Sequence, residues 1–366
     1  MALPLIQAFT ARAIGTAWNT YEQSLGLPPY LGRSFFGTQK RQGLRLEWIK
    51  GSKGLPVALK ASNFDAQAPL RDAIGFKTIE NTMPFFRESY MVTEQEEQDY
   101  MTYMDSSNPA MARQVLAEIM KKPLDLIQGA DVVPERMIWS LLAPADGVPR
   151  IPVVVDGGST YYVDYTADSG SAYKAKNYSK ITSATAKWTV PATATPIQDL
   201  AKMQEDYEEN YGGKLTTFCM NQKTWKLLVN AEDTKKQVAG VLAYNAGMIV
   251  KDSAVKEYLL ANYGITVLVY NKKFVDESGN TKTFIPDYIV TAKTDGLLGN
   301  VWYGTTPEER SGNLATGELS IVNTGVSVYT YGTNHPVNTH CVVSEIVLPS
   351  YEGMDNVAIL NVSASE

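Results

Sequence analysis

The chain has 366 residues and a formal net charge of −6, so it is long enough for about two or three compact units with large buried cores. The acidic balance argues against a dedicated nucleic-acid binder, which would carry a basic stripe. Two cysteines, Cys219 and Cys341, give no disulfide framework and indicate a reducing compartment. The sequence contains no run of about 18 apolar residues that could cross a membrane.

Residues 43–61 have the pattern of a β-hairpin that projects as an arm. Leu44, Leu46 and Trp48 alternate with charged residues, which is the period-2 pattern of a strand with one apolar face. A glycine-rich turn and a second alternation over 55–59 predict the return strand. A lone two-stranded hairpin is marginal in water, because nothing covers its apolar face. We therefore expect the arm either to fold back onto its own domain or to lie on another subunit.

Helical patterns follow the arm. Thr93 and Glu96 form a capping-box pair that predicts the start of a short helical turn. Over about 109–143, apolar residues recur at three- and four-residue spacing, which predicts a long helix. We expect Gly129 to interrupt this helix and Asp131 to cap its continuation.

Hairpin, α/β and β-rich patterns follow in that order. Strand patterns at 151–155 and 161–165 flank a glycine-rich turn and predict a second hairpin. Residues 196–305 alternate strands with helices, which is typical of a compact α/β unit. The residues expected to cap helices in this unit are Thr195, Asn221 and Ser253. The C-terminal part, 319–362, is rich in strand patterns.

Patterns that would carry catalysis are weak. The two histidines, His335 and His340, lie near Cys341 and could supply three metal ligands. Their spacing matches no zinc motif, and in a strand His340 and Cys341 would point to opposite faces. Carboxylates gather at 94–99 and 205–209, where the first turn of a helix and a solvated helix face explain them. We therefore expect no enzyme activity, and we assign no catalytic residue, metal or cofactor.

The order of these elements resembles the major capsid (head) proteins of tailed bacteriophages, in the branch typified by the phage lambda head protein. The resemblance covers most of the chain, although it is poor over 150–195 and at the extreme N-terminus. The stretches that carry it are residues 31–36, Asn108-Pro109-Ala110, Asn221-Gln222-Lys223-Thr224-Trp225, residues 270–288 with Phe284-Ile285-Pro286-Asp287, and Gly299-Asn300-Val301-Trp302-Tyr303-Gly304.

The resemblance implies an α+β chain with the HK97-type phage capsid fold. An N-terminal arm would occupy 1–33, and an extended loop with the hairpin 43–61 would occupy 34–84. A peripheral domain would comprise 85–195 and 320–366, with a long spine helix over about 109–143. An α/β axial domain would occupy 196–319.

The resemblance also implies a function. A protein of this family self-assembles into the icosahedral head shell that encloses the double-stranded DNA genome of a tailed bacteriophage. It assembles in the host bacterial cytoplasm, passes through procapsid maturation and ends in the virion. Its partners would be copies of itself in pentamers and hexamers, a scaffolding protein and a portal, with a decoration protein left open. Packaged DNA would be contacted only non-specifically, and no membrane would be involved.

A shell subunit needs large contact areas and mixed charge on projecting arms. The residues expected at subunit interfaces are Leu44, Arg45, Leu46, Glu47, Trp48, Lys50, Lys53, Arg87 and Glu88. Leu44, Leu46 and Trp48 would form a buried apolar anchor, and the charged residues of the arm would form ion pairs between subunits. Two alternatives stay open, an encapsulin-like nanocompartment shell and a metal-dependent hydrolase that uses His335 and His340.

Overall fold

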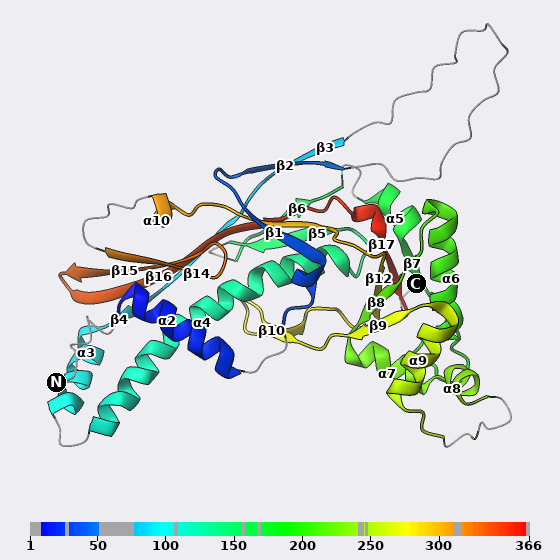
Figure 1. The fold of residues 1–366 in the computed structure, drawn as a ribbon, viewed down its shortest axis with the longest axis horizontal. Coiled ribbons are helices and arrows are strands. Elements are labelled where there is room, and N and C mark those ends of the chain that lie inside the picture. The colour runs from blue at the N-terminus through cyan, green and yellow to red at the C-terminus, as the bar shows by residue number, and fades with distance from the viewer. Residues whose placement is uncertain are drawn as a thin grey trace, which may run out of the picture. The chain divides into compact units, whose positions relative to one another are not determined.

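A computed structural model describes residues 9–25, 29–50, 77–105, 109–155, 158–166, 170–240, 245, 248–310 and 317–363 (Figure 1). The chain divides into two compact units. The first comprises residues 1–46, 80–136 and 300–350, and the second comprises residues 47–79, 137–299 and 351–366. Each unit has its own sheet and its own buried core.

The first unit is built on a six-stranded sheet. Its strands, in spatial order, are β1 (Phe36–Lys40), β13 (Gly299–Tyr303), β16 (Val337–Pro349), β15 (Val326–Asn334) and β14 (Gly317–Val322), and β4 (Phe85–Val92) also pairs with β16. Strand β16 has β15 antiparallel along one edge, and β4 followed by β13 along the other. Residues 341–349 of β16 are all buried, as expected for a strand covered on both faces.

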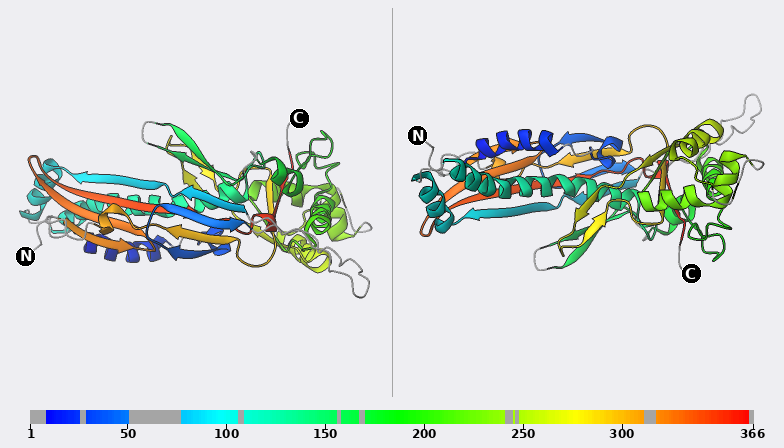
Figure 2. Two further views of the ribbon diagram at one scale, coloured as in Figure 1. Left: turned by 90° about the horizontal axis from the view of Figure 1, so that it is seen from above. Right: turned by 90° about the horizontal axis from the view of Figure 1, so that it is seen from below.

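Two helices lie on one face of this sheet: α2 (Ala11–Leu25), and the part of α4 (Pro109–Leu142) that belongs to the first unit (Figure 2). In α2, Ala11, Ile14 and Trp18 recur at three- and four-residue spacing and are almost completely buried. They share a core with Ile119 and Ile127 of α4 and with strands β15 and β16. Burying each large side chain stabilises the unit by about 1.5–3 kcal/mol, so packing rather than propensity holds the helices here.

Helix α4 is unbroken, so the predicted interruption at Gly129 and the restart at Asp131 are wrong. The Asp131 carboxylate accepts hydrogen bonds from Arg33 and Asn323 instead of capping a helix. An internal glycine costs about 1 kcal/mol relative to alanine. The packing of buried residues such as Ile127 outweighs that cost.

Helix α3 (Glu94–Asp105) precedes α4, and its predicted capping box is confirmed. The Thr93 backbone N–H donates to the Glu96 carboxylate at 2.9 Å, and the Glu96 N–H donates to Thr93 Oγ1 at 3.3 Å. The helix has 12 residues, so it is longer than the predicted single turn. Two shorter elements complete the unit, the 3-10 helix η1 (Gly32–Phe35) and α10 (Pro307–Arg310).

The second unit contains a five-stranded mixed sheet. Its strands, in spatial order, are β7 (Tyr178–Lys180), β17 (Val357–Asn361), β12 (Ile289–Lys293), β8 (Thr217–Met220) and β9 (Thr266–Val269). Strand β12 is antiparallel to both of its neighbours, whereas β7 runs parallel to β17 and β9 parallel to β8. The helices of this unit are α5 (Ser171–Asn177), α6 (Pro196–Tyr211), α7 (Gln222–Asn230), α8 (Glu232–Ala239) and α9 (Asp252–Tyr263), with the 3-10 helix η2 (Met354–Asn356) before β17.

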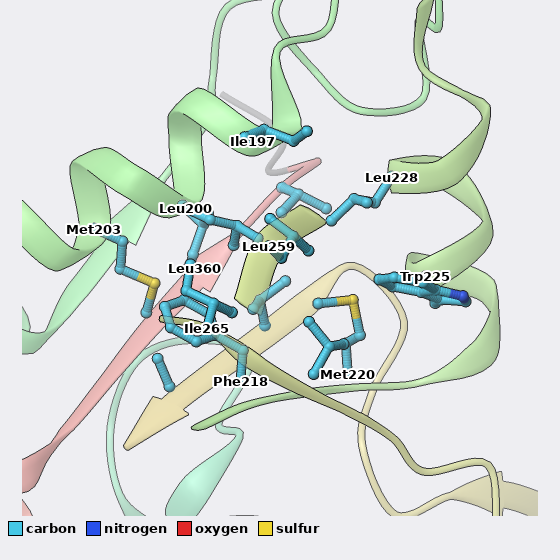
Figure 3. Close-up of a cluster of buried hydrophobic side chains, with 14 of the residues drawn as sticks. Ile197, Leu200, Met203, Phe218, Met220, Trp225, Leu228, Leu259, Ile265 and Leu360 are labelled. Carbon is cyan, nitrogen blue, oxygen red and sulfur yellow. The ribbon is translucent and has the colours of Figure 1, made fainter. Parts of the chain in front are cut away.

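The core of the second unit is formed where α6, α7 and α9 pack on the sheet (Figure 3). Leu200 of α6, Leu228 of α7 and Leu259 of α9 are all 0% exposed, as is Phe218 of β8. Tyr207 and Tyr211 also face inward from α6, while the acids at 205–209 lie on its exposed face, as predicted.

One of the three predicted helix caps of this unit is confirmed in full. The Asn221 side chain accepts a hydrogen bond from the Thr224 N–H at 2.8 Å. Thr195 occupies the cap position of α6, but its side chain makes no cap hydrogen bond. Its backbone carbonyl accepts a hydrogen bond from the Asp199 N–H. Ser253 is not a cap, because α9 begins one residue earlier and Lys251 precedes it.

Among the described residues, three pairs of strands form separate two-stranded sheets. The predicted hairpin near 151–165 is confirmed as β5 (Arg150–Val154) paired with β6 (Thr160–Asp164). Strand β10 (Lys273–Val275) pairs with β11 (Thr281–Thr283), and β2 (Arg45–Lys50) pairs with β3 (Lys77–Thr82).

The compact units do not follow the predicted domain boundaries everywhere. Residues 137–195 and 351–363, which were assigned to the peripheral domain, group with the α/β residues from 196 onward. Strand β17 explains part of this grouping, since it pairs with β12 and β7 in the sheet of the second unit. The assignment of capsid domains stays a prediction.

Candidate interface surfaces

The base of the predicted arm is formed by β2 and β3. The Met83 N–H donates to the Leu44 carbonyl at 2.8 Å, one residue beyond the paired strands. The predicted turn and the return strand over 55–59 lie outside the described residues. Within the described part, the partner of β2 is therefore a strand further along the chain than the predicted one.

Two of the three predicted apolar anchors are buried within the chain itself. Leu46 is 1% exposed and Trp48 is 6% exposed, whereas Leu44 is 49% exposed. The Trp48 ring centroid lies 5.2 Å from that of Tyr165. Residues of the same chain already cover Leu46 and Trp48, and an interface role for the apolar row stays a prediction. Leu44 alone of the three presents a large apolar surface to solvent.

The charged residues of the arm base are exposed. Arg45 Nη1 lies 3.4 Å from Glu80 Oε1, and both side chains are largely in solvent. Such exposed pairs contribute about 0.2–1 kcal/mol, so Arg45 could exchange this partner for one on another subunit at little cost. Glu47 is exposed. The Lys50 side chain and all of Lys53 lie outside the described residues, and ion pairs between subunits at these positions stay predictions.

Arg87 and Glu88 lie on β4, and their environments differ. Arg87 Nη2 lies 2.8 Å from Glu308 Oε1, and the Glu308 side chain is only 9% exposed. The guanidinium carbon of Arg87 also lies 4.5 Å from the centroid of the Phe85 ring. Arg87 therefore holds α10 on its own sheet, whereas Glu88 is exposed on the same strand. An interface role for Glu88 stays a prediction.

A buried acidic cluster, which the sequence analysis missed, holds the residues that lead into β1. Glu135 of α4 is 0% exposed and accepts hydrogen bonds from the Gly32 N–H at 2.8 Å and the Arg33 N–H at 3.0 Å. Arg33 Nη2 donates to the Asp131 carbonyl and, at 3.2 Å, to its Oδ1. Asn323 Nδ2 donates to the same carboxylate. One signal was present, since Asp131 and Glu135 are spaced four apart on the buried face of a helix.

Glu345 of β16 is a buried carboxyl group without a hydrogen-bond partner among the described residues. It is 1% exposed, and burial raises the pKa of Glu345 well above its usual value, with Asp131 adding to this effect and Arg33 opposing it. Burial thus favours the protonated form. Arg33 Nε is also buried without a partner in the described part of the chain.

His340 and Cys341 lie on strand β16, whereas His335 lies in the turn between β15 and β16. The His340 ring stacks on Tyr331, with centroids 4.8 Å apart and planes inclined by 8°. Cys341 is 0% exposed in the core on the other face, as predicted, and burial raises the pKa of its thiol to about 12. Within the described residues, no group of three or more His, Cys, Asp or Glu side chains could hold a metal ion.

A hollow of about 560 Å³ in the second unit is lined by three lysines and one aspartate, among other residues. Lys223 Nζ lies 2.6 Å from Asp287 Oδ2, and Lys282 Nζ lies 2.7 Å from Asp276 Oδ2. Acids of the same unit therefore compensate much of the positive charge of this hollow.

Residues 10–323 match the family described as phage major capsid protein E. A prophage protein from E. coli CFT073 that is described as a capsid protein has a similar structure, with a TM-score of 0.56, 12% identity and coverage of 99% of this chain and 100% of the other. A phage-related protein from Bordetella bronchiseptica RB50 has a TM-score of 0.51 at 10% identity, with coverage of 95% and 97%. No curated protein matches the sequence. Across the described residues, every helix is too short or too polar to span a bilayer.

Proposed function

Because the chain belongs to the phage major capsid protein E family, it is a shell-forming structural protein of the virion, and we propose that it builds an icosahedral head from pentamers and hexamers. Its α+β structure is the HK97-type capsid fold, and a protein of this family and fold is structural rather than enzymatic. The observation that carries the proposal is the family match over residues 10–323. This match favours a phage head over a nanocompartment shell, and nothing in the described residues supports a hydrolase site at His335 and His340.

The arm supports an assembly in which neighbouring subunits overlap. In the described part of the arm, β2 and β3 form a two-stranded base, and residues 51–76 connect them in the sequence. If extended, about 26 residues that run out and back reach roughly 40 Å, which is enough to cross onto an adjacent subunit. An arm of that length is suited to linking copies of the chain.

The partners of the shell belong to the same proposal. A scaffolding protein would guide the copies into a procapsid, and a portal would admit double-stranded DNA, after which the shell would mature. The net charge of −6 suits a container that contacts its DNA only non-specifically and must release it, because a strongly basic wall would retain the phosphates. Membership of the branch typified by the lambda head protein also stays a proposal.

Assembly can be tested directly. The protein would be produced alone and together with any scaffold protein encoded beside its gene, and particles would be sought by sedimentation and negative-stain imaging. We expect closed shells of uniform diameter, with five- and six-fold clusters of subunits in image averages. A chain that stays monomeric at all concentrations, with and without scaffold, would refute the proposal.

A further inference from the structure

The hollow of about 560 Å³ in the second unit, here called the lysine hollow, has a basic and polar lining. It lies where the start of α7 meets the strand pair β10 and β11 (Figure 1). The side chains that matter for its chemistry are Lys223, Lys273, Lys282, Asn271, Thr281 and Asp287. Positive charges therefore outnumber negative ones on this lining, although the whole chain carries a net charge of −6. A hollow of this volume is within the range of about 300–1,000 Å³ that is typical of ligand sites.

Asp287, the acid of this lining, is held beside one of the three lysines. Its Oδ2 lies 2.6 Å from Lys223 Nζ, and its Oδ1 accepts a hydrogen bond from Asn221 Nδ2 at 2.7 Å. Asn221 is 1% exposed, and its own Oδ1 accepts from the Thr224 N–H. The cap of α7 thus fixes the carboxylate next to Lys223, and the other two lysines do not share it.

The other two lysines differ in their partners. Lys282 Nζ lies 2.7 Å from Asp276 Oδ2. Asp276 also accepts from the N–H groups of Ser278 and Asn280, which ties it into the turn between β10 and β11. Lys273 is exposed and makes no ion pair with any described residue. The lysine hollow therefore holds one ammonium group whose charge no acid of the described chain compensates.

Hydrogen-bond donors are left over around this ammonium group. A lysine ammonium has three N–H donors, and an ion pair with one carboxylate oxygen occupies one of them in Lys223 and in Lys282. Thr281 lies on the same face of the strand pair as Lys273, because its register partner Val275 is two residues from Lys273 along β10. Three lysines from three elements suit an anion with several oxygens and more than one charge. Phosphate groups have this chemistry.

We propose that the lysine hollow binds phosphate groups, with Lys273 as the main contact and Lys223 and Lys282 beside it. For a chain that encloses double-stranded DNA, the backbone phosphates of that DNA are the source. The choice of source rests on the proposed function, whereas phosphate binding by the hollow does not. Exposed ion pairs contribute about 0.2–1 kcal/mol, so the lysines exchange partners at little cost and the contact is weak and reversible. A container that releases its DNA needs contacts of this kind.

A calorimetric titration with sodium tripolyphosphate tests the hollow. The full-length chain would be used at low ionic strength and at a concentration where subunits do not assemble. We expect saturable binding that Lys273→Glu weakens by at least about tenfold, because it places a like charge against the anion. Asp287→Asn should strengthen binding about threefold, since it frees Lys223 and keeps an acceptor for Asn221. A matched control, Lys202→Glu on the exposed face of α6, should bind as the wild type does.

Chemical labelling locates the bound anion. Lysine amines would be acetylated with and without tripolyphosphate, and the rate at each position would be followed by mass spectrometry. The anion should slow acetylation of Lys273 at least about threefold and leave Lys202 unchanged. Circular dichroism would confirm that each variant is folded. Absence of binding to the wild type, equal binding by Lys273→Glu, or equal protection of Lys202 would each overturn the inference.

A short DNA duplex distinguishes the two sources of phosphate. It should displace tripolyphosphate from the wild type, and Lys273→Glu should weaken its binding. If the duplex binds without displacing tripolyphosphate, DNA is overturned as the source and free phosphates are the ligand. If the wild type forms shells but its hollow binds no phosphate, the inference fails while the proposed function stands. If tripolyphosphate binds at Lys273 but the chain never forms shells, the proposed function fails and the phosphate site stands.

Discussion

Glu135 should be one of the most important polar side chains of the first unit. It is 0% exposed, and its two carboxylate oxygens accept from the backbone N–H groups of Gly32 and Arg33 at 2.8 and 3.0 Å. A hydrogen bond to a charged group contributes about 1.5–3 kcal/mol, so two of them give a gross loss of about 3–6 kcal/mol in Glu135→Ala. Removal of a buried charge returns part of this loss. We therefore expect a net destabilisation of about 3 kcal/mol.

The assay is urea unfolding of dispersed subunits, followed by fluorescence and circular dichroism. Asp125→Ala is the matched control, because Asp125 is exposed on the same helix, and it should change the free energy of unfolding by less than about 0.5 kcal/mol. Glu135→Gln keeps one acceptor and should fall between the two. Protease cleavage near residues 30–35 should accelerate in Glu135→Ala. A free energy of unfolding within about 0.5 kcal/mol of the wild type would refute the assignment of this contact as a structural anchor.

Other predictions concern titration, capping and thiol reactivity. Burial raises the pKa of Glu345 in the folded state above its value in the unfolded chain, so the folded state holds a proton that the unfolded state releases. The free energy of unfolding therefore falls by about 1.4 kcal/mol per pH unit as the pH rises from about 4.5 towards the folded pKa. Glu345→Gln should therefore be more stable than the wild type at pH 8, with the advantage vanishing near pH 4.5, and a constant difference across this range would contradict the prediction. Asn221→Ala should lower the free energy of unfolding by about 1–2 kcal/mol, because it removes the side-chain cap of α7. Thr195→Ala removes no side-chain cap bond and should lower it by less than about 0.5 kcal/mol. Equal losses for the two variants in urea unfolding would count against the capping geometry. Cys219 and Cys341 are buried, and burial raises the pKa of each thiol to about 12, so both should react with a disulfide reagent at pH 8 only after unfolding; rapid labelling of the native chain would show that a thiol is accessible.

Local patterns in the sequence predicted local structure well. Thr93 with Glu96 specified a capping box, and Asn221 specified a helix start. The alternation around 151–165 specified a hairpin. Each of these signals lies within a few residues along the chain, so backbone geometry alone makes it readable.

Where local signals competed with tertiary packing, packing prevailed. Gly129 does not interrupt α4, since the buried face of the helix continues past it. The Asp131 carboxylate accepts a hydrogen bond from Asn323. The spacing of apolar residues gives no sign that the segment of Asn323 packs against α4. The alternation that predicted an anchor for a neighbour at Leu46 and Trp48 was a correct strand pattern. The sequence did not show which molecule would cover that face.

The amino-acid sequence by itself determined the order of helices and strands, and through that order the family to which the chain belongs. Tertiary structure alone decided which carboxylates are buried beside Arg33, which strand pairs with β2, and which side chains of the arm base stay exposed. The physical reason is that periodicity reports whether a residue faces an apolar environment. The identity of that environment depends on segments a hundred or more residues away, as the contacts between Glu135 and Gly32 demonstrate.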